Sequence, residues 1–278
     1  MTRRGFLQQA ALGVSVSALA WTAWPTWAAG SQTNLLDAGL TAYLARHVRW
    51  NAAGTTTAVD YAGVRRDRPQ LQRLLAGFSR ITLPEFSSWE REAREAFLVN
   101  AYNVWTLALI ADAPADTGSI KDLGGFLRSP WKKSFIPFLG ETRSLDDIEH
   151  SLLRGAPDFN EPRIHFAVNC ASIGCPALRP EAYTAARWDT QLEDQAQRFL
   201  RDRSRNRVER GDPLKLAVSA IFKWYAADFD RAGGVSAFLS RYPDALGLSD
   251  RDRAALVRGD ARLTYLDYDW TLNDRIAP

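Results

Sequence analysis

The chain has 278 residues, of which 46% are hydrophobic and 24% charged, and it contains ten Trp and thirteen Phe. This composition is that of a globular protein with enough apolar surface for a substantial core, and it excludes a disordered or low-complexity chain. The formal net charge is +3, and it falls to +1 without the two arginines of the N-terminal segment described next. A charge so close to zero gives no reason to expect a nucleic-acid partner or a membrane surface.

The first 29 residues have the pattern of an export signal. Arg3 and Arg4 form a twin-arginine pair that precedes an apolar, Ala-rich stretch and then small residues suited to cleavage after Ala28 or Ala29. We therefore expect residues 1–29 to be a twin-arginine-type signal peptide of a periplasmic or otherwise exported protein. A retained membrane anchor is the alternative, although the apolar run is shorter than the ~20 residues that a span needs.

Periodicity predicts the remaining elements in chain order. Apolar residues at helical spacing predict helices over residues 34–48, 70–78, 88–111, 144–154, 184–202, 235–241 and 250–257. Short runs with β-branched and aromatic residues predict strands over residues 131–136, 164–168, 214–218 and 262–270. Together they predict one α+β domain over residues 30–278, with a mostly helical N-terminal half packed on a modest antiparallel sheet that contains residues 164–168 and the C-terminal strand.

The predicted helix 88–111 is apolar on all sides in its second half, which is typical of a buried helix. Asn100 and Asn103 interrupt this apolar run and lie nearly on one face. Because an unpaired buried amide costs about 1–3 kcal/mol, both must have partners. They either hold the backbone of a neighbouring loop or line a site, and we include Asn100 and Tyr102 as candidate substrate-binding residues.

The reactive side chains are concentrated in Ile164–Pro176. This stretch holds both cysteines, Cys170 and Cys175, together with His165 and Asn169. Its first half predicts a buried strand, and its small, polar second half predicts a tight loop. A loop held by a rigid element can present a nucleophile, and it can equally carry a disulfide.

His150 is a second candidate imidazole. Ser144 and Asp147 form a capping-box variant that opens a short helix. On this helix His150 lies within reach of Asp146, Asp147 and Arg154. Neighbouring carboxylates orient an imidazole and raise its pKa, as a catalytic base requires, although a solvated surface histidine has the same pattern.

Several stretches resemble one family. They are AFLVNAYNVWTLALI from Ala96, SLDDIEHSLLR from Ser144, RIHFAVNCASIGCPAL from Arg163, SAIFKWYAADF from Ser219 and TYLDYDWTLN from Thr264. In this order, with Asn-x-Tyr-Asn, Cys-x4-Cys-Pro and Tyr-Asp-Trp-x-Leu-Asn intact, they resemble the family called domain of unknown function 547 (DUF547). The chain resembles papain-like and transglutaminase-like cysteine hydrolases more weakly, and the family itself implies no established activity.

The first hypothesis for the chemistry is acyl transfer by a thiolate, acting on a peptide or on another amide or ester. The candidate catalytic residues are Cys170, Cys175, His150, His165, Asn103 and Asn169. Backbone N–H groups of residues 171–174 could stabilise the oxyanion. Five residues of extended chain span about 16 Å, so His165 is not expected to reach Cys170, and His150 is the preferred base.

Two alternatives use the same residues. A Cys170–Cys175 disulfide, which an oxidising compartment permits, would make the protein a non-catalytic binding or assembly module. Two cysteines with His150 and His165 have the ligand count for zinc, but Cys-x4-Cys is only a fair match to known spacings. We therefore expect no metal or other cofactor, and the cysteine chemistry stays open at this point.

Overall fold

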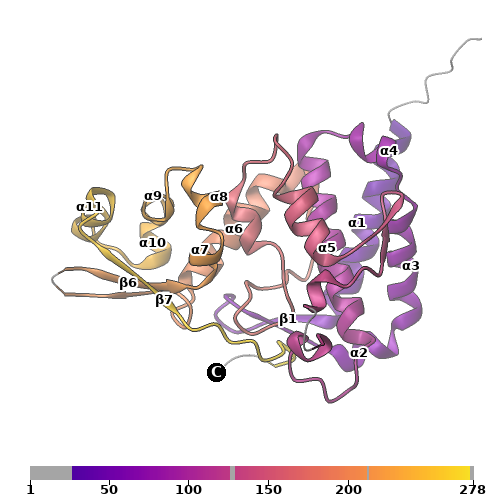
Figure 1. Ribbon diagram of the computed structural model, residues 1–278, viewed down its shortest axis with the longest axis horizontal. Coiled ribbons are helices and arrows are strands. Elements are labelled where there is room, and N and C mark those ends of the chain that lie inside the picture. The colour runs from indigo at the N-terminus through magenta and orange to yellow at the C-terminus, as the bar shows by residue number, and fades with distance from the viewer. Residues whose placement is uncertain (1–26, 126–128, 212, 276–278) are drawn as a thin grey trace, which may run out of the picture.

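The computed structural model describes residues 27–125, 129–211 and 213–275 (Figure 1). The expected signal peptide lies outside these residues, except for its last three. The α-helices are α1 Trp27–His47, α2 Tyr61–Arg66, α3 Arg68–Arg80, α4 Leu83–Ser87, α5 Arg91–Ala111, α6 Trp188–Arg201, α7 Ile221–Trp224, α8 Ala226–Asp230, α9 Val235–Leu239, α10 Pro243–Leu246 and α11 Asp250–Arg258. None of the helices in the described ranges is both long and apolar enough to cross a membrane.

The strands are short. They are β1 Val48–Trp50, β2 Thr57–Val59, β3 Ile136–Phe138, β4 Glu141–Arg143, β5 Arg207–Glu209, β6 Lys215–Ser219 and β7 Arg262–Leu266. The pairs β1–β2 and β3–β4 are antiparallel, and a third sheet has the order β5-β6-β7. In that sheet β5 and β6 are antiparallel, whereas β6 and β7 are parallel because helices α7–α11 connect them in a crossover. The α+β class, with helices mainly in the N-terminal half, is confirmed.

Shorter helical turns complete the described chain. The 3-10 turns are Ile120–Leu123, Pro130–Lys132, Pro162–Phe166 and Ala185–Arg187, and Asp147–Leu153 is π-helical. The strand predicted over residues 131–136 is displaced toward the C-terminus. Pro130 opens a 3-10 turn there, and the strand begins only at Ile136. A tight turn joins β3 to β4, and both Leu139 and Gly140 have the positive φ that a tight hairpin requires.

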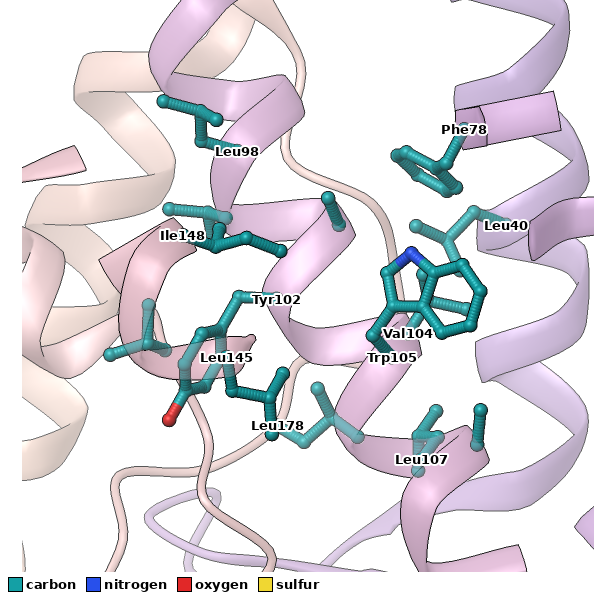
Figure 2. Close-up of a cluster of buried hydrophobic side chains, with 14 of the residues drawn as sticks. Leu40, Phe78, Leu98, Tyr102, Val104, Trp105, Leu107, Leu145, Ile148 and Leu178 are labelled. Carbon is teal, nitrogen blue, oxygen red and sulfur yellow. The ribbon is translucent and has the colours of Figure 1, made fainter. Parts of the chain in front are cut away.

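Helix α5 is the centre of the N-terminal half. Every residue from Glu95 to Ala111 is buried, as the all-round apolar pattern predicts. Figure 2 shows Tyr102 directed toward the π-helical segment, while Trp105 lies on the side of α5 that faces α1 and α3. The two faces of one helix therefore join the N-terminal helices to the segment that carries His150.

A second core lies under the C-terminal half. It is built around Phe166, whose ring packs on those of Phe199, Phe222 and Phe238 at 4.9–5.8 Å between centroids. The first core is the one that surrounds α5. Helix α6 contributes to both cores, since Leu192 belongs to the first and Phe199 to the second. In Figure 1, α6 lies between helices α1–α5 and the group formed by α9–α11 and β6–β7.

The predicted strand over residues 164–168 is wrong. Pro162 opens a 3-10 turn here, and the Glu161 carboxylate caps it by accepting from the backbone N–H of Arg163. The run is buried as expected, but Ile164 enters the first core and Phe166 the second. A continuous apolar run does not distinguish a buried strand from a buried helical turn, and the expected sheet therefore does not contain this segment.

The chain beyond β7 returns to the middle of the molecule, where it runs toward β1 (Figure 1). Backbone hydrogen bonds tie it to the cysteine loop, from Ile173 N to Thr271 O at 2.8 Å and from Asn273 N to Ala171 O at 3.1 Å. The N–H of Val59 in β2 donates to Asn273 O at 2.9 Å. These bonds place the Tyr-Asp-Trp stretch beside the cysteines.

Candidate functional site

The two cysteines form a disulfide in a loop that is held from several sides. The Cα atoms of Cys170 and Cys175 are 6.1 Å apart, and the backbone N–H of Cys170 donates to Cys175 Sγ at 2.8 Å. Ala171 has a positive φ of 62°, and its N–H donates to Asn169 Oδ1 at 3.0 Å. The side chain of Asn169 thus supports an otherwise unfavourable backbone conformation.

Asn103 and Asn169 hold this loop in place. Asn103 Nδ2 donates to Ala167 O at 3.0 Å, and Asn103 Oδ1 accepts from Asn169 N at 2.8 Å. Asn169 Nδ2 donates to Pro176 O at 2.8 Å, which closes the loop from its other end. Both amides, predicted as catalytic orienting groups, therefore bond backbone atoms around the cysteines.

Asn100 lies elsewhere. Its amide donates to Tyr183 O at 2.8 Å and accepts from Tyr183 N at 2.9 Å, so it fixes the segment that precedes α6. It is not among the residues that line the cavity described next, whereas its neighbour Tyr102 is.

A cavity of about 230 Å³ opens over the disulfide. Aromatic rings form much of its wall: Tyr102, Trp131, Trp224, Tyr225, Tyr268 and Trp270. Its polar lining consists of Ser129, Asp146, Glu149, His150, His165 and the two cysteines. The structure thus brings together Cys170, Cys175, His150, His165 and Tyr102, which the sequence singled out.

His165 is the buried imidazole of this cavity. Its Nε2 lies 2.7 Å from Asp228 Oδ2, and its ring stacks on Tyr225 with centroids 3.8 Å apart. Its Nδ1 is buried without a hydrogen-bond partner among the described residues. Burial lowers the pKa of His165 below its ordinary value and outweighs the opposing hydrogen bond to Asp228. A neutral ring that donates from Nε2 leaves Nδ1 free to accept a proton.

Asp228 holds a charge next to this imidazole. Burial opposes its ionisation, but the hydrogen bonds from His165 and Arg154 outweigh burial and hold the pKa of Asp228 well below its usual range. Arg154 Nε donates at 2.6 Å and Arg231 at 2.5 Å. The carboxylate is therefore ionised across the physiological range and fixes the orientation of the His165 ring.

His150 is placed differently. Its side chain is 39% exposed, Arg154 donates to its Nδ1 at 2.6 Å, and its Nε2 lies 3.5 Å from Asp146. Both ring nitrogens are thus engaged near the cavity mouth. Of the two imidazoles in the lining, His165 has the geometry of a base oriented by a carboxylate, although we expected His150 to have this role. That expectation assumed that His165 lies in an extended strand, whereas it lies in the 3-10 turn Pro162–Phe166.

Several functional groups of the cavity were not singled out from the sequence. Glu149 accepts a hydrogen bond from Tyr225 at 2.5 Å, and burial together with this carboxylate raises the pKa of Tyr102 well above its ordinary value. The guanidinium of Arg154 lies over the Tyr225 ring, 4.9 Å from its centroid. Tyr225 and Asp228 lie in a stretch quoted for the family resemblance, which was the available sign of their importance.

The sulfurs contact a phenol that sequence reasoning also missed. Tyr268 Oη lies 3.1 Å from both Cys170 Sγ and Cys175 Sγ, and the Ser172 hydroxyl donates to it at 3.3 Å. Burial raises the pKa of Tyr268 above its ordinary value, so its hydroxyl keeps its proton.

Three of the four backbone N–H groups expected to stabilise an oxyanion are occupied. Those of Ala171, Ile173 and Gly174 donate to Asn169 Oδ1, Thr271 O and Asp269 O. Besides the backbone N–H of Cys170, the hydroxyls of Tyr268 and Ser172 lie next to the sulfurs.

The zinc alternative requires both cysteines as thiolate ligands beside His150 and His165. In the ranges that the structure describes, no three or more His, Cys, Asp or Glu side chains are grouped to hold a metal ion. The two sulfurs are bonded to one another, so they are not available as thiolate ligands in this state.

Fold and site together define an α+β protein with a disulfide at the base of an aromatic cavity. Residues 86–200 match the family model described as "Protein of unknown function, DUF547". The predicted resemblance is confirmed over these residues, which include α5, His165 and both cysteines. No curated protein and no solved structure matches the chain, and the papain-like resemblance gains no support.

Proposed function

We propose that the cavity is the active site of a thiol-dependent hydrolase or acyl transferase, in which Cys170 is the nucleophile once the disulfide is reduced. The observation that carries the proposal is the buried His165–Asp228 pair: His165 lines the same cavity as the two cysteines, and its Nδ1 has no hydrogen-bond partner among the described residues. An imidazole oriented by a carboxylate beside a thiol is the arrangement that activates a cysteine nucleophile.

Each group has a role in this chemistry. The Cys170 thiolate attacks the carbonyl carbon of a peptide, amide or ester, and His165 carries the thiol proton to the leaving group. Asp228 holds the imidazole in the required tautomer. The hydroxyls of Tyr268 and Ser172 stabilise the oxyanion in place of the occupied backbone N–H groups. This scheme needs no metal or other cofactor.

The lining indicates what kind of substrate fits. Trp131, Trp224 and Trp270 offer ring faces, and Trp224 is 47% exposed. Among the described residues, the lining includes the carboxylates of Asp146 and Glu149 but no lysine or arginine. A substrate with an apolar or planar group next to an ammonium or another hydrogen-bond donor suits these walls.

Alkylation of the reduced protein tests the base. The pH dependence of Cys170 alkylation by iodoacetamide is measured by mass spectrometry for wild type, His165→Gln and the matched control His150→Gln. A lone thiol titrates near 8.5, so wild type is expected to react with a lower midpoint that His165→Gln moves up toward that value. His150→Gln keeps the wild-type midpoint. Equal midpoints in wild type and His165→Gln would contradict the proposed base.

Reaction with an activated ester tests the nucleophile. Wild type is expected to form an acyl-enzyme on Cys170 with p-nitrophenyl acetate, at a rate that His165→Gln lowers by about 10²–10⁴. Cys170→Ser removes the adduct, and Cys175→Ser retains it. Absence of an adduct on reduced wild type would reject the proposed enzyme.

The second candidate function is a non-catalytic periplasmic binding or assembly module stabilised by the disulfide. The closed Cys170–Cys175 bond favours it, because the loop is already tied without any thiol chemistry. In this case reduction lowers stability, the reduced thiols react like ordinary ones, and no acyl adduct forms.

We also propose export by the twin-arginine route, which the Arg3-Arg4 pair supports. The disulfide is consistent with an oxidising compartment. A variant with both arginines changed to lysine is expected to remain in the cytoplasm with its N-terminal segment uncleaved, whereas the wild-type chain begins at Ala29 or Gly30. Export of both proteins in equal amounts would reject this route.

A further inference from the structure

The two sulfurs of the disulfide have unequal surroundings. Cys175 is 3% exposed, whereas Cys170 is partly exposed. Thiol–disulfide exchange requires an attacking thiolate to reach one sulfur, and the rate depends on which sulfur is attacked. The cavity therefore favours attack on Cys170 Sγ.

The hydrogen bonds favour the same direction. The backbone N–H of Cys170 donates to Cys175 Sγ at 2.8 Å, and this donor distinguishes Cys175 from Cys170. The Tyr268 hydroxyl lies 3.1 Å from both sulfurs, accepts from Ser172 and is placed to donate to the sulfur that leaves. A sulfur that leaves as a thiolate is stabilised by donors that already point at it, and hydrogen bonds to charged atoms are the stronger kind. Cys175 is thus prepared as the leaving group.

From these contacts we infer that the Cys170–Cys175 disulfide is redox-active and exchanges with a small thiol that carries an apolar group and enters the aromatic cavity. The incoming thiolate forms a bond to Cys170 Sγ while the Cys170–Cys175 bond breaks, and Cys175 leaves as a thiolate. A second small thiolate then attacks the sulfur of the first small thiol in this mixed disulfide, and Cys170 leaves as a thiolate. Two thiols are oxidised to one external disulfide, and the protein disulfide is reduced to two thiols.

The cavity supports the stated class of thiol. Its volume of about 230 Å³ admits a small molecule, and aromatic rings form much of its wall. The exchange goes beyond the proposed hydrolase: it produces the free Cys170 that such an enzyme needs, but it requires no acyl substrate. The two proposals can therefore fail separately.

Trapping of the mixed disulfide tests the direction of attack. Single-cysteine variants of the mature chain, Cys175→Ser and Cys170→Ser, are mixed with benzyl disulfide, and the adduct is followed by mass spectrometry. The adduct on Cys170 is expected to form at least about tenfold faster than the adduct on Cys175. Equal rates, or a faster reaction at Cys175, would overturn the assignment.

Reduction of the native disulfide tests the leaving group. Wild-type protein is treated with benzyl mercaptan or with the charged 2-mercaptoethanesulfonate under conditions where circular dichroism shows that it stays folded. Benzyl mercaptan is expected to reduce it faster, and Tyr268→Phe is expected to slow that reaction about tenfold, as for one lost hydrogen bond to a charged atom.

Two further variants keep this test decisive. Tyr265→Phe removes a phenol from β7, where Tyr265 is 41% exposed, and should reduce at the wild-type rate. Ser172→Ala, which withdraws the donor to Tyr268, should slow reduction less than Tyr268→Phe. Reduction that occurs only when the protein unfolds, or equal rates in wild type and both site variants, would reject a redox-active disulfide.

Discussion

Asn103 and His165 are both buried polar side chains next to the cysteine loop, but their hydrogen bonding differs. Asn103 uses both its donor and its acceptor on backbone atoms of the loop. His165 uses one nitrogen on Asp228, and its other nitrogen has no partner among the described residues. Asn103 thus holds the framework of the loop, whereas His165 lines the cavity with one nitrogen unpaired. The comparison predicts that the two residues respond differently to substitution.

The largest expected loss of stability comes from removing the partner of His165. Asp228→Ala leaves the buried His165 and Arg154 without their shared carboxylate, and breaking a buried pair costs about 3–5 kcal/mol. Urea unfolding measures the loss. Asp228→Asn, which retains the shape, should lose less. A loss below about 1 kcal/mol would mean that the pair is not part of the folded framework.

Asn103→Ala tests the framework side. It leaves the carbonyl of Ala167 and the N–H of Asn169 unpaired, which at about 1–3 kcal/mol each predicts a loss of at least about 2 kcal/mol in urea unfolding. The pH midpoint of Cys170 alkylation should stay at its wild-type value. If the midpoint moves while stability is retained, Asn103 acts in the chemistry and the distinction fails.

Glu95 is a third buried polar side chain to compare with Asn103 and His165. It is a carboxylate on α5 that does not line the cavity. Burial raises its pKa to about 7, although Arg91 Nε lies 3.8 Å away and opposes the rise. The unfolded state ionises near pH 4.3, so the penalty on the folded state grows as the pH rises from there to about 7. Glu95→Gln should stabilise the protein by about 1–3 kcal/mol at pH 8 and have no effect at pH 4. Equal effects at both pH values would contradict the raised pKa.

The smallest effect is the pH dependence due to His165. Its pKa is lowered in the folded state by burial, so below about pH 6.5 the unfolded chain binds a proton that the folded chain does not. Stability should therefore fall as the pH drops below this value, by at most ~1.4 kcal/mol per pH unit for one proton. His165→Gln should remove this part of the slope, as measured by urea unfolding at pH 5, 6 and 7. An unchanged slope would mean that another group titrates there.

The sequence predicted the elements whose apolar spacing is regular. Helices α1, α3, α5 and α6 and strand β6 follow the expected ranges, because each has a clear apolar face or is wholly buried in a long run. Residues 164–168 failed for a physical reason. Two separate cores bury alternate sides of a short turn, and such a run has no period that distinguishes it from a strand.

In the candidate site, contacts between residues close in sequence were predicted, and contacts between distant residues were not. The Cys170–Cys175 pair is local, so its spacing permitted the prediction of a disulfide. His165 and Asp228 are 63 residues apart, and Cys170 and Tyr268 are 98 apart. No local pattern connects such distant residues, and the choice between His150 and His165 depended on a turn that the apolar run did not reveal.

The position of the cavity-forming residues near the C-terminus determines when the site can be completed during synthesis. Both cysteines emerge from the ribosome about a hundred residues before Tyr268 and Trp270, which form part of the cavity wall, and before Asn273, which bonds to the cysteine loop. The loop can thus be made long before its cavity exists. The segment following β7 completes the site, and the cavity becomes available only in a chain that has folded through residue 273.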